Sequence, residues 1–147
     1  MQPTQQGAAT DDTAAEFLGW LVETRAITSI LAERVARVRS ETADGLAAIL
    51  LKLGLISEPD LASSFAGFCR LPRLDFARVP GSAPEIGLLN ESFLRTREIV
   101  PLRVTDNEIE IACWDPLDEY VVQALRFALG CNVVRCVGTR EELRRAL

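Results

Sequence analysis

The sequence predicts an α+β fold, with N-terminal helical hairpins followed by a small α/β unit of order β-β-α-β-α and a short mixed or antiparallel sheet. Two observations predict it. Apolar residues recur at helical spacing through residues 13–70, and β-branched runs separated by turn residues fill much of 99–137. We therefore expect three parts: a disordered polar tail (1–12), a helical subdomain of two degenerate hairpins (13–70) and a small α+β subdomain (71–147).

Hydroxyl side chains mark the expected helix starts of the helical subdomain. Thr13 and Glu16 have the spacing of a capping box, in which a hydroxyl and a carboxylate satisfy the free amides of a first turn. Ser57 precedes two acids and Pro59, which suit the electropositive start of a helix. Gly54 suits the left-handed conformation that closes a helix. The expected helices begin near Thr13 and cover 29–40, 44–53 and 57–69.

The helical subdomain repeats itself with an offset of 29 residues. In each copy an apolar helix is followed by a short turn that contains an isoleucine, then by a hydroxyl cap and a second helix. Two stacked helical hairpins would explain this pattern. The matching pairs are Leu21 with Leu50, Ile27 with Ile56 and Thr28 with Ser57.

The second subdomain carries signals for a hairpin, a helix, a strand and a final helix. Turn residues at 105–107 lie between two strand patterns and predict the hairpin. Asp115 and Pro116 predict a helix start, which also explains the acids at Asp118 and Glu119 without a metal. The expected elements are short helical turns at 84–89 and 91–97, strands at 99–104, 108–113 and 132–137, a helix from Pro116 to Leu129 and a helix capped by Thr139.

The composition excludes several classes of function. The 147 residues hold 16 Lys and Arg against 21 Asp and Glu, a net charge of −5, which disfavours binding to nucleic acid. The absence of histidine removes the commonest general base and metal ligand, and Lys52 is the single lysine. The four cysteines form no C-x-x-C pair, and no apolar run reaches about 18 residues. We expect no enzyme activity, cofactor, metal or membrane insertion.

Several segments together resemble one known family. They are Leu50 to Leu61 (LLKLGLISEPDL), Leu71-Pro72 with Asp75, Val100-Pro101-Leu102, Ile109 to Trp114 with Asp115-Pro116, and Gly138 to Glu142. In this combination the chain is similar to the N-terminal, MshEN-type domain of the type II secretion ATPase, the E component. The resemblance implies a non-catalytic domain that precedes a hexameric ATPase motor. It also implies docking onto the cytoplasmic domain of the inner-membrane L component.

The chain itself lacks the residues of such a motor. No G-x-x-x-x-G-K-[ST] phosphate loop is present, since Leu53 follows Lys52. The ATPase domain would therefore lie downstream, and the chain is either a fragment or a free-standing adaptor. A helical pattern that continues to Leu147 favours a fragment. The resemblance further implies a cytoplasmic location, peripheral to the inner membrane through the partner.

We expect the partner to bind the first helix. Trp20 lies off the apolar stripe of that helix, and tryptophan is favoured at the centre of protein interfaces. The docking face would be apolar with a polar rim, and the candidate residues are Phe17, Trp20, Leu21 and Thr24. The alternative is that Trp20 is a core residue shared between the hairpins.

Other functions stay open. Related secretion and pilus ATPase domains bind cyclic di-GMP through a duplicated motif that begins R-L-G, and the repeat here has its spacing. Glu16 and Gly45 stand at the arginine positions, and Leu18 and Ala47 at the first glycine positions, so the apolar frame is kept without the polar ligand contacts. The alternatives are a cyclic di-GMP-sensing domain, or the same domain on a type IV pilus ATPase or a membrane glycosyltransferase.

Overall fold

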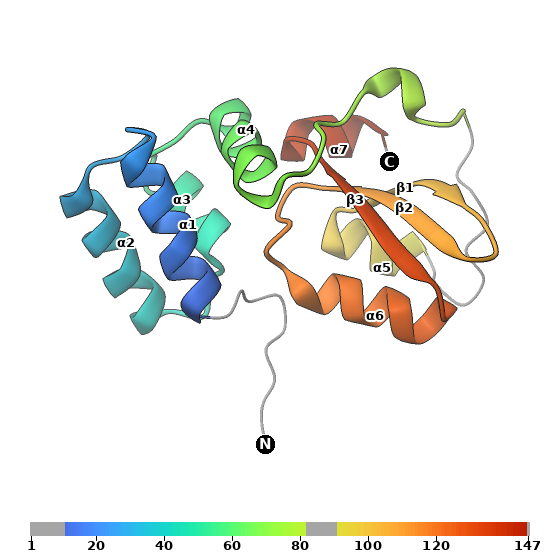
Figure 1. Cartoon of the computed structure of the whole chain (residues 1–147), viewed down its shortest axis with the longest axis horizontal. Coiled ribbons are helices and arrows are strands. Elements are labelled where there is room, and N and C mark those ends of the chain that lie inside the picture. The colour runs from blue at the N-terminus through green and yellow to red at the C-terminus, as the bar shows by residue number, and fades with distance from the viewer. Residues whose placement is uncertain (1–10, 82–90, 147) are drawn as a thin grey trace.

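The computed structural model describes residues 11–81 and 91–146, and its α+β architecture confirms the predicted fold class. The helices are α1 Asp11–Glu23, α2 Ser29–Glu41, α3 Leu46–Lys52, α4 Glu58–Cys69, α5 Glu91–Arg97, α6 Glu119–Leu129 and α7 Arg140–Ala146, with a 3-10 turn η1 at Phe76–Arg78. Helices α1 to α4, the helical half, gather at one end of the molecule. The strands with α5, α6 and α7, the sheet half, form the other end (Figure 1).

The two hairpins of the helical half have the same local geometry. Thr28 and Ser57 cap α2 and α4, and each hydroxyl accepts a hydrogen bond from the amide three residues on, at 3.2 Å in both. The turn before each cap contains a left-handed residue, Arg25 (φ 64°) in the first hairpin and Gly54 (φ 69°) in the second. Since 29 residues separate both pairs, the predicted repeat is present in the structure.

One apolar core fills the helical half and continues into the sheet half. Phe17 and Phe65 are fully buried at its centre, and Leu117 and Val137 of the sheet half belong to the same cluster. Trp114 packs against this cluster and also against the core beneath α7. The two halves are therefore joined by apolar contact, as expected for units that are each small for independent stability.

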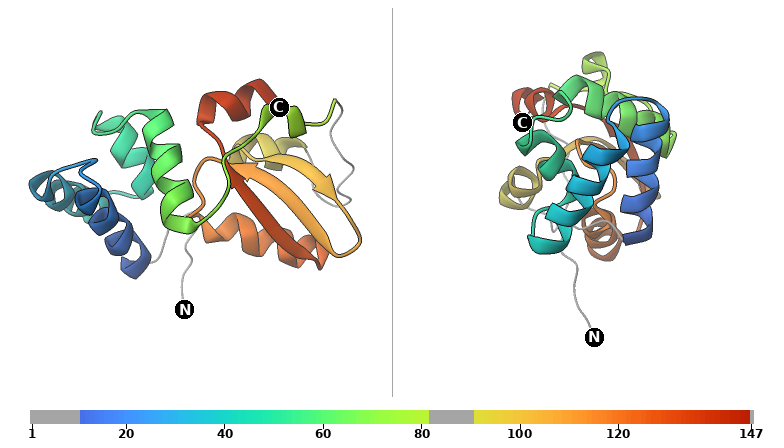
Figure 2. Two further views of the ribbon diagram at one scale, coloured as in Figure 1. Left: turned by 45° about the horizontal axis from the view of Figure 1, so that its top comes forward. Right: turned by 90° about the vertical axis from the view of Figure 1, so that its left-hand side faces the viewer.

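The sheet has three strands in the order β1-β2-β3, with bounds Val100–Val104, Glu108–Cys113 and Asn132–Val137. β1 pairs antiparallel with β2, and β2 pairs parallel with β3, so the sheet is mixed. Pro101 lies on the edge strand β1, beside a register shift, where its missing amide costs least. α6 and α7 lie on opposite faces of the sheet (Figure 2).

The first helix starts earlier than expected. α1 begins at Asp11, so Thr13 lies within its first turn and does not cap it. The remainder of the predicted tail, 1–10, and the predicted helical turn at 84–89 lie outside the described residues. Within the described ranges, no helix is long and apolar enough to cross a membrane.

The start of α6 also differs from the prediction. Asp118, not Asp115, caps this helix, and its carboxylate accepts a hydrogen bond from the Tyr120 amide at 3.1 Å. Asp115 instead forms a turn by accepting from the Leu117 amide at 3.1 Å. This turn places Leu117 in the core shared by both halves, so tertiary packing decided between two possible caps.

Candidate docking surface

Trp20 is the outermost member of a row of aromatic rings that starts in the core. The ring of Phe17 stacks on Phe65 at 4.5 Å between centroids and meets Phe68 edge-on at 5.2 Å. Phe68 in turn meets the indole of Trp20 edge-on at 5.8 Å. Phe17 and Phe65 are fully buried, whereas Phe68 and Trp20 are half-buried. The indole is thus held by the core while part of it faces outward.

Glycines on two helices shape the surroundings of the indole. A methyl group on Gly67 of α4 would lie 3.2 Å from Cζ2 of Trp20, tighter than an ordinary contact, so glycine allows this close approach. A methyl group on Gly19 of α1 would meet no atom within 4 Å. We call the residues Gly19, Trp20, Gly67 and Phe68 the Trp20 surface. It presents the half-buried aromatic rings of Trp20 and Phe68 together with an open position at Gly19.

The four residues predicted to bind a partner differ in how far they are exposed. Phe17 and Leu21 have no exposed surface, so in the folded chain they lie beneath the surface that a partner could reach. Thr24 is exposed, but its hydroxyl donates to the carbonyl of Trp20 at 2.9 Å, so it offers a partner only acceptor capacity. Trp20 is half-buried against Phe68, so it belongs both to the seam between hairpins and to the surface.

A groove borders the Trp20 surface where the two halves meet. It encloses about 300 Å³ and is lined by residues of α1, α4, α6, β3 and the turn before α6. Phe68 belongs both to this groove and to the Trp20 surface. Its other side chains include the apolar Leu117 and Val122 and the charged Glu119, Arg126 and Arg135. Sequence reasoning missed the groove because α1, α4 and α6 meet only in the folded chain.

A second cleft of about 290 Å³ lies at another part of the junction and contains both acids of the turn before α6. Burial raises the pKa of Asp115 to about 7, and the neighbouring charge of Asp118 adds to the shift. Both carboxylates are engaged by backbone amides of their own turn. In the described part of the chain, no group of three or more His, Cys, Asp and Glu side chains is arranged to hold a metal ion.

Glu98 ties α5 to α7 at the rim of this cleft. Its φ of 54° lies in the left-handed region, which a glutamate adopts only at a cost. Arg140 donates two hydrogen bonds to its carboxylate, at 2.9 and 2.6 Å, and the same guanidinium lies 4.7 Å over the ring of Trp114. The hydrogen bond from Arg140 lowers the pKa of Glu98 below its ordinary value. This ion pair offsets the strained backbone.

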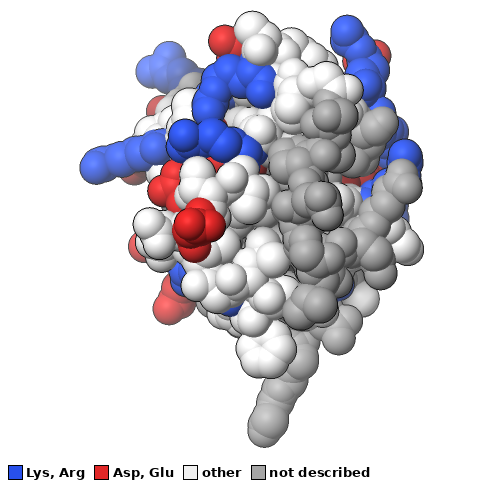
Figure 3. Space-filling view, turned by 90° about the vertical axis from the view of Figure 1, so that its right-hand side faces the viewer, with Lys and Arg blue, Asp and Glu red and all other residues white. Residues whose placement is uncertain are grey.

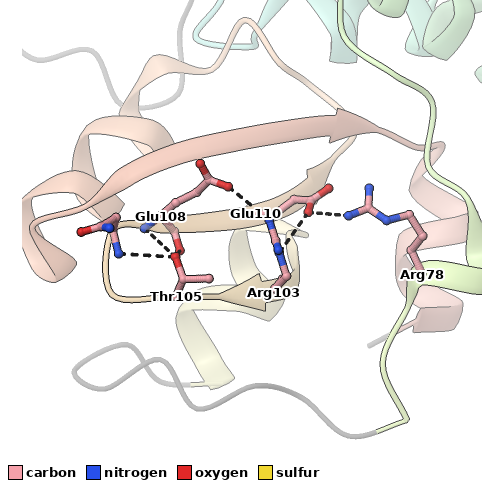
Figure 4. Close-up of polar contacts among 6 residues, drawn as sticks. Arg78, Arg103, Thr105, Glu108 and Glu110 are labelled. Atoms are coloured by element: carbon pink, nitrogen blue, oxygen red, sulfur yellow. Dashed lines mark hydrogen bonds and ion pairs between the residues drawn. The ribbon is translucent and has the colours of Figure 1, made fainter.

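Charged side chains also pair with one another on the face of the sheet that packs against α7. Glu110 on the central strand is only 6% exposed, and its carboxylate lies 2.5 Å from Arg78 and 3.9 Å from Arg103 (Figure 4). On the face shown in Figure 3, basic and acidic side chains lie next to each other. This interleaving differs from the one-sign patch that phosphate backbones require.

The four cysteines are free, and burial favours the protonated thiol at three of them, Cys69, Cys113 and Cys136. Burial raises the pKa of Cys113 and of Cys69, and it raises that of Cys136 to about 11. A thiolate is the nucleophilic and metal-binding form of cysteine. These positions therefore contribute to packing.

The structure combines a half-buried aromatic surface on α1 and α4 with charged side chains, among them Glu98 and Glu110, that pair within the fold. The chain belongs to the MshEN domain family, whose model matches residues 69–147, more than half of its length. The matched domain is non-catalytic. The match begins at the last residue of α4, so most of the helical half lies before it.

Known proteins match nearly all of the chain. It is 32% identical over 127 residues to the type II secretion system protein E of Xanthomonas campestris pv. campestris, which covers 84% of this chain and 22% of that protein. The chain thus spans about a fifth of that relative. The N-terminal domain of XpsE has a similar structure, with a TM-score of 0.74, 28% identity and coverage of 99% of this chain and 96% of that one.

Two further structures have the same fold. A second crystal form of the XpsE N-terminal domain gives a TM-score of 0.64 at 27% identity, covering 99% of this chain and 97% of that one. A structure of MshE with cdg gives a TM-score of 0.68 at 23% identity, covering 88% and 94%. At this identity the second similarity concerns the fold alone.

Two of the four positions compared with the cyclic di-GMP motif are packed in the core of this structure. Leu18 and Ala47, at the first glycine positions, are buried with 8% and 1% exposure. Gly45 precedes α3 as its N-cap residue, and Glu16 is exposed on α1. The apolar frame of the repeat is therefore the core of the helical half.

Proposed function

We propose that the chain is the N-terminal docking and regulatory domain of a type II secretion ATPase. It binds the cytoplasmic domain of the inner-membrane L component and couples the motor to the secretion platform. The similarity to type II secretion system protein E and to the XpsE N-terminal domain supports this assignment of the machine. In this proposal the ATPase domain lies downstream, and the chain is cytoplasmic and peripheral to the inner membrane through its partner.

The Trp20 surface is the observation that carries the proposed docking. Trp20 is held by the ring of Phe68 and by close approach to Gly67, so little side-chain entropy is lost when a partner covers it. Aromatic anchors of this kind contribute most of the binding free energy at many interfaces. The open space at Gly19, the residue before Trp20, allows a partner backbone to approach α1 next to the anchor residue.

A calorimetric titration with the purified cytoplasmic domain of the L component tests the proposal. Two changes should each weaken binding at least tenfold. Trp20→Glu removes the aromatic anchor and adds a charge. Gly19→Gln fills the open space without touching the core, and it should leave the melting temperature unchanged or higher, because glycine is a poor helix former.

Ile30→Glu is the matched control. Ile30 lies on α2 and is 73% exposed, so it offers another apolar side chain of the helical half outside the Trp20 surface. This variant should bind within twofold of the parent chain. Absence of binding by the parent at high micromolar concentration would overturn the proposed function, and so would equal losses for the control and the two surface variants.

A further inference from the structure

The groove between the halves is lined by both apolar and charged side chains. Phe68 and Val122 are half-buried along it, and Leu117 is buried at its base. Arg126 in the last turn of α6 is exposed. Arg135 of β3 lines the same groove and donates one hydrogen bond to the carbonyl of Pro116.

The positions of Val122 and Arg126 on α6 define the distance between an apolar group and a carboxylate of a ligand in the groove. Val122 and Arg126 are four residues apart on one helix, so their side chains lie on the same side, about 6 Å apart at Cβ. An apolar side chain against Val122 and a carboxylate at Arg126 would therefore be separated by about one helical turn or two extended residues. Glu119 lies one turn before Val122 and disfavours an acid at that end of the groove.

The groove shares the side chain of Phe68 with the Trp20 surface. Phe68 lines the groove and also contacts the indole of Trp20, with ring centroids 5.8 Å apart. A partner that covers Trp20 therefore meets the groove at its border. The net charge of −5 would repel an acidic partner from most of the chain, whereas Arg126 provides an exposed cation on the groove.

We propose that the groove is the second part of the docking surface and that it binds a partner segment in which an apolar side chain is followed by a carboxylate. The apolar side chain lies against Phe68 and Val122, and the carboxylate pairs with Arg126. This proposal rests on the docking function proposed above. It extends that function by assigning the sheet half a direct role in recognition, through α6 and β3.

Charge reversal at Arg126 tests the groove. In a titration with the cytoplasmic domain of the L component, Arg126→Glu should weaken binding about five- to tenfold at low salt, and the loss should shrink as salt rises. Arg126→Gln should give a smaller loss. Arg34→Glu on α2 is the control, because Arg34 is an exposed arginine that does not line the groove, and it should bind within twofold of the parent.

The outcomes separate the two proposals. If Trp20→Glu and Gly19→Gln weaken binding while Arg126→Glu does not, the docking function stands and the groove proposal is wrong. If Phe127→Ala weakens binding and Arg126→Glu does not, the partner covers the outer side of α6, where Phe127 is 94% exposed, and the groove proposal is also wrong. If the parent chain does not bind, the docking function itself fails.

Discussion

The helical half and the sheet half use their side chains in different ways. The helical half is built on a row of aromatic rings, and the ion pair between Lys52 and Asp44 on its surface is well exposed, at 70% and 42% of the side chains. The sheet half places Glu98 and Glu110 in shielded positions and pairs them with arginines. Buried and shielded pairs depend on both members, whereas exposed pairs contribute little.

This difference indicates where binding and stability reside. The aromatic row of the helical half ends in a half-buried ring, which leaves Trp20 available to a partner. In the sheet half, Glu98 and Glu110 are engaged with arginines within the fold, whereas Arg126 is exposed on the groove. Docking is therefore expected at the helical half and along the border between the halves.

Truncation of the central aromatic ring should have the largest effect. Phe17→Ala removes a fully buried ring that contacts Phe65 and Phe68, so it should lower the free energy of unfolding by about 3–5 kcal/mol. Urea denaturation followed by circular dichroism and by tryptophan fluorescence measures this. Because Leu117 and Val137 share the same core, both probes should report one transition. Two separate transitions would show that the halves unfold independently.

Asp115, the half-buried acid of the junction, should give the chain an unusual pH dependence. The folded form keeps a proton on Asp115 up to about pH 7, while the unfolded form releases it near 3.8. Stability should therefore fall as pH rises through this window, by at most about 1.4 kcal/mol per pH unit. Asp115→Asn keeps a side-chain oxygen that can accept from the Leu117 amide, and it removes the titrating carboxyl. The free energy of unfolding of this variant should therefore depend less on pH. Parallel curves of stability against pH for the parent and the variant would contradict the raised pKa of Asp115.

The Glu98–Arg140 pair should show the opposite pH behaviour. Because the pKa of Glu98 is lowered, its contribution is present above the ordinary carboxyl pKa and is lost as pH falls below it. Glu98→Gln should cost about 1–2 kcal/mol at pH 7, and the difference from the parent should vanish in acid. Glu98→Gly compares the cost of the strained backbone with the benefit of the ion pair, because glycine adopts a φ of 54° without strain but cannot pair with Arg140. An increase in stability for that variant would mean that strain outweighs the pair.

The smallest effect is expected in the repeated turn. Arg25 holds a left-handed conformation that Gly54 holds in the second hairpin. Arg25→Gly should raise the free energy of unfolding by about 0.5–1 kcal/mol, because an arginine pays a steric cost there. Gly54→Ala is the reciprocal control and should lower it by a similar amount. A thermal melt of both variants would separate this conformational effect from any contact made by the Arg25 side chain.

Local chemistry predicted most of the fold. Ser57 caps α4 as expected, and Thr139 and Glu142 form the reciprocal capping box before α7, at 2.8 and 3.0 Å. Gly130 closes α6 with a φ of 64°. Asp115 was predicted wrongly as a cap because Asp115 and Asp118 both carry a capping signal. The burial of Leu117 decides between them, and it depends on contacts with residues far away in the sequence.

The candidate site was only partly predictable. Trp20 stood out because it lies off the apolar stripe of its helix, whereas Phe17 and Leu21 lie on that stripe and are buried. Gly67 offered a signal in the sequence that could have located this contact. A glycine inside a helix lowers stability, so its presence indicates that another group approaches the helix closely, as Trp20 does here. Arg126 carried none, because its role depends on α1 and α4 meeting α6.

Hydrogen–deuterium exchange of the chain with and without the cytoplasmic domain of the L component tests the central claim most directly. The claim is that the partner covers the Trp20 surface and the adjoining groove. Added protection should appear in α1, in the C-terminal part of α4 and in α6, and the β1–β2 turn at 105–107 should exchange unchanged. Protection confined to α7 or to the β1–β2 turn, with α1 and α4 unaffected, would contradict the account.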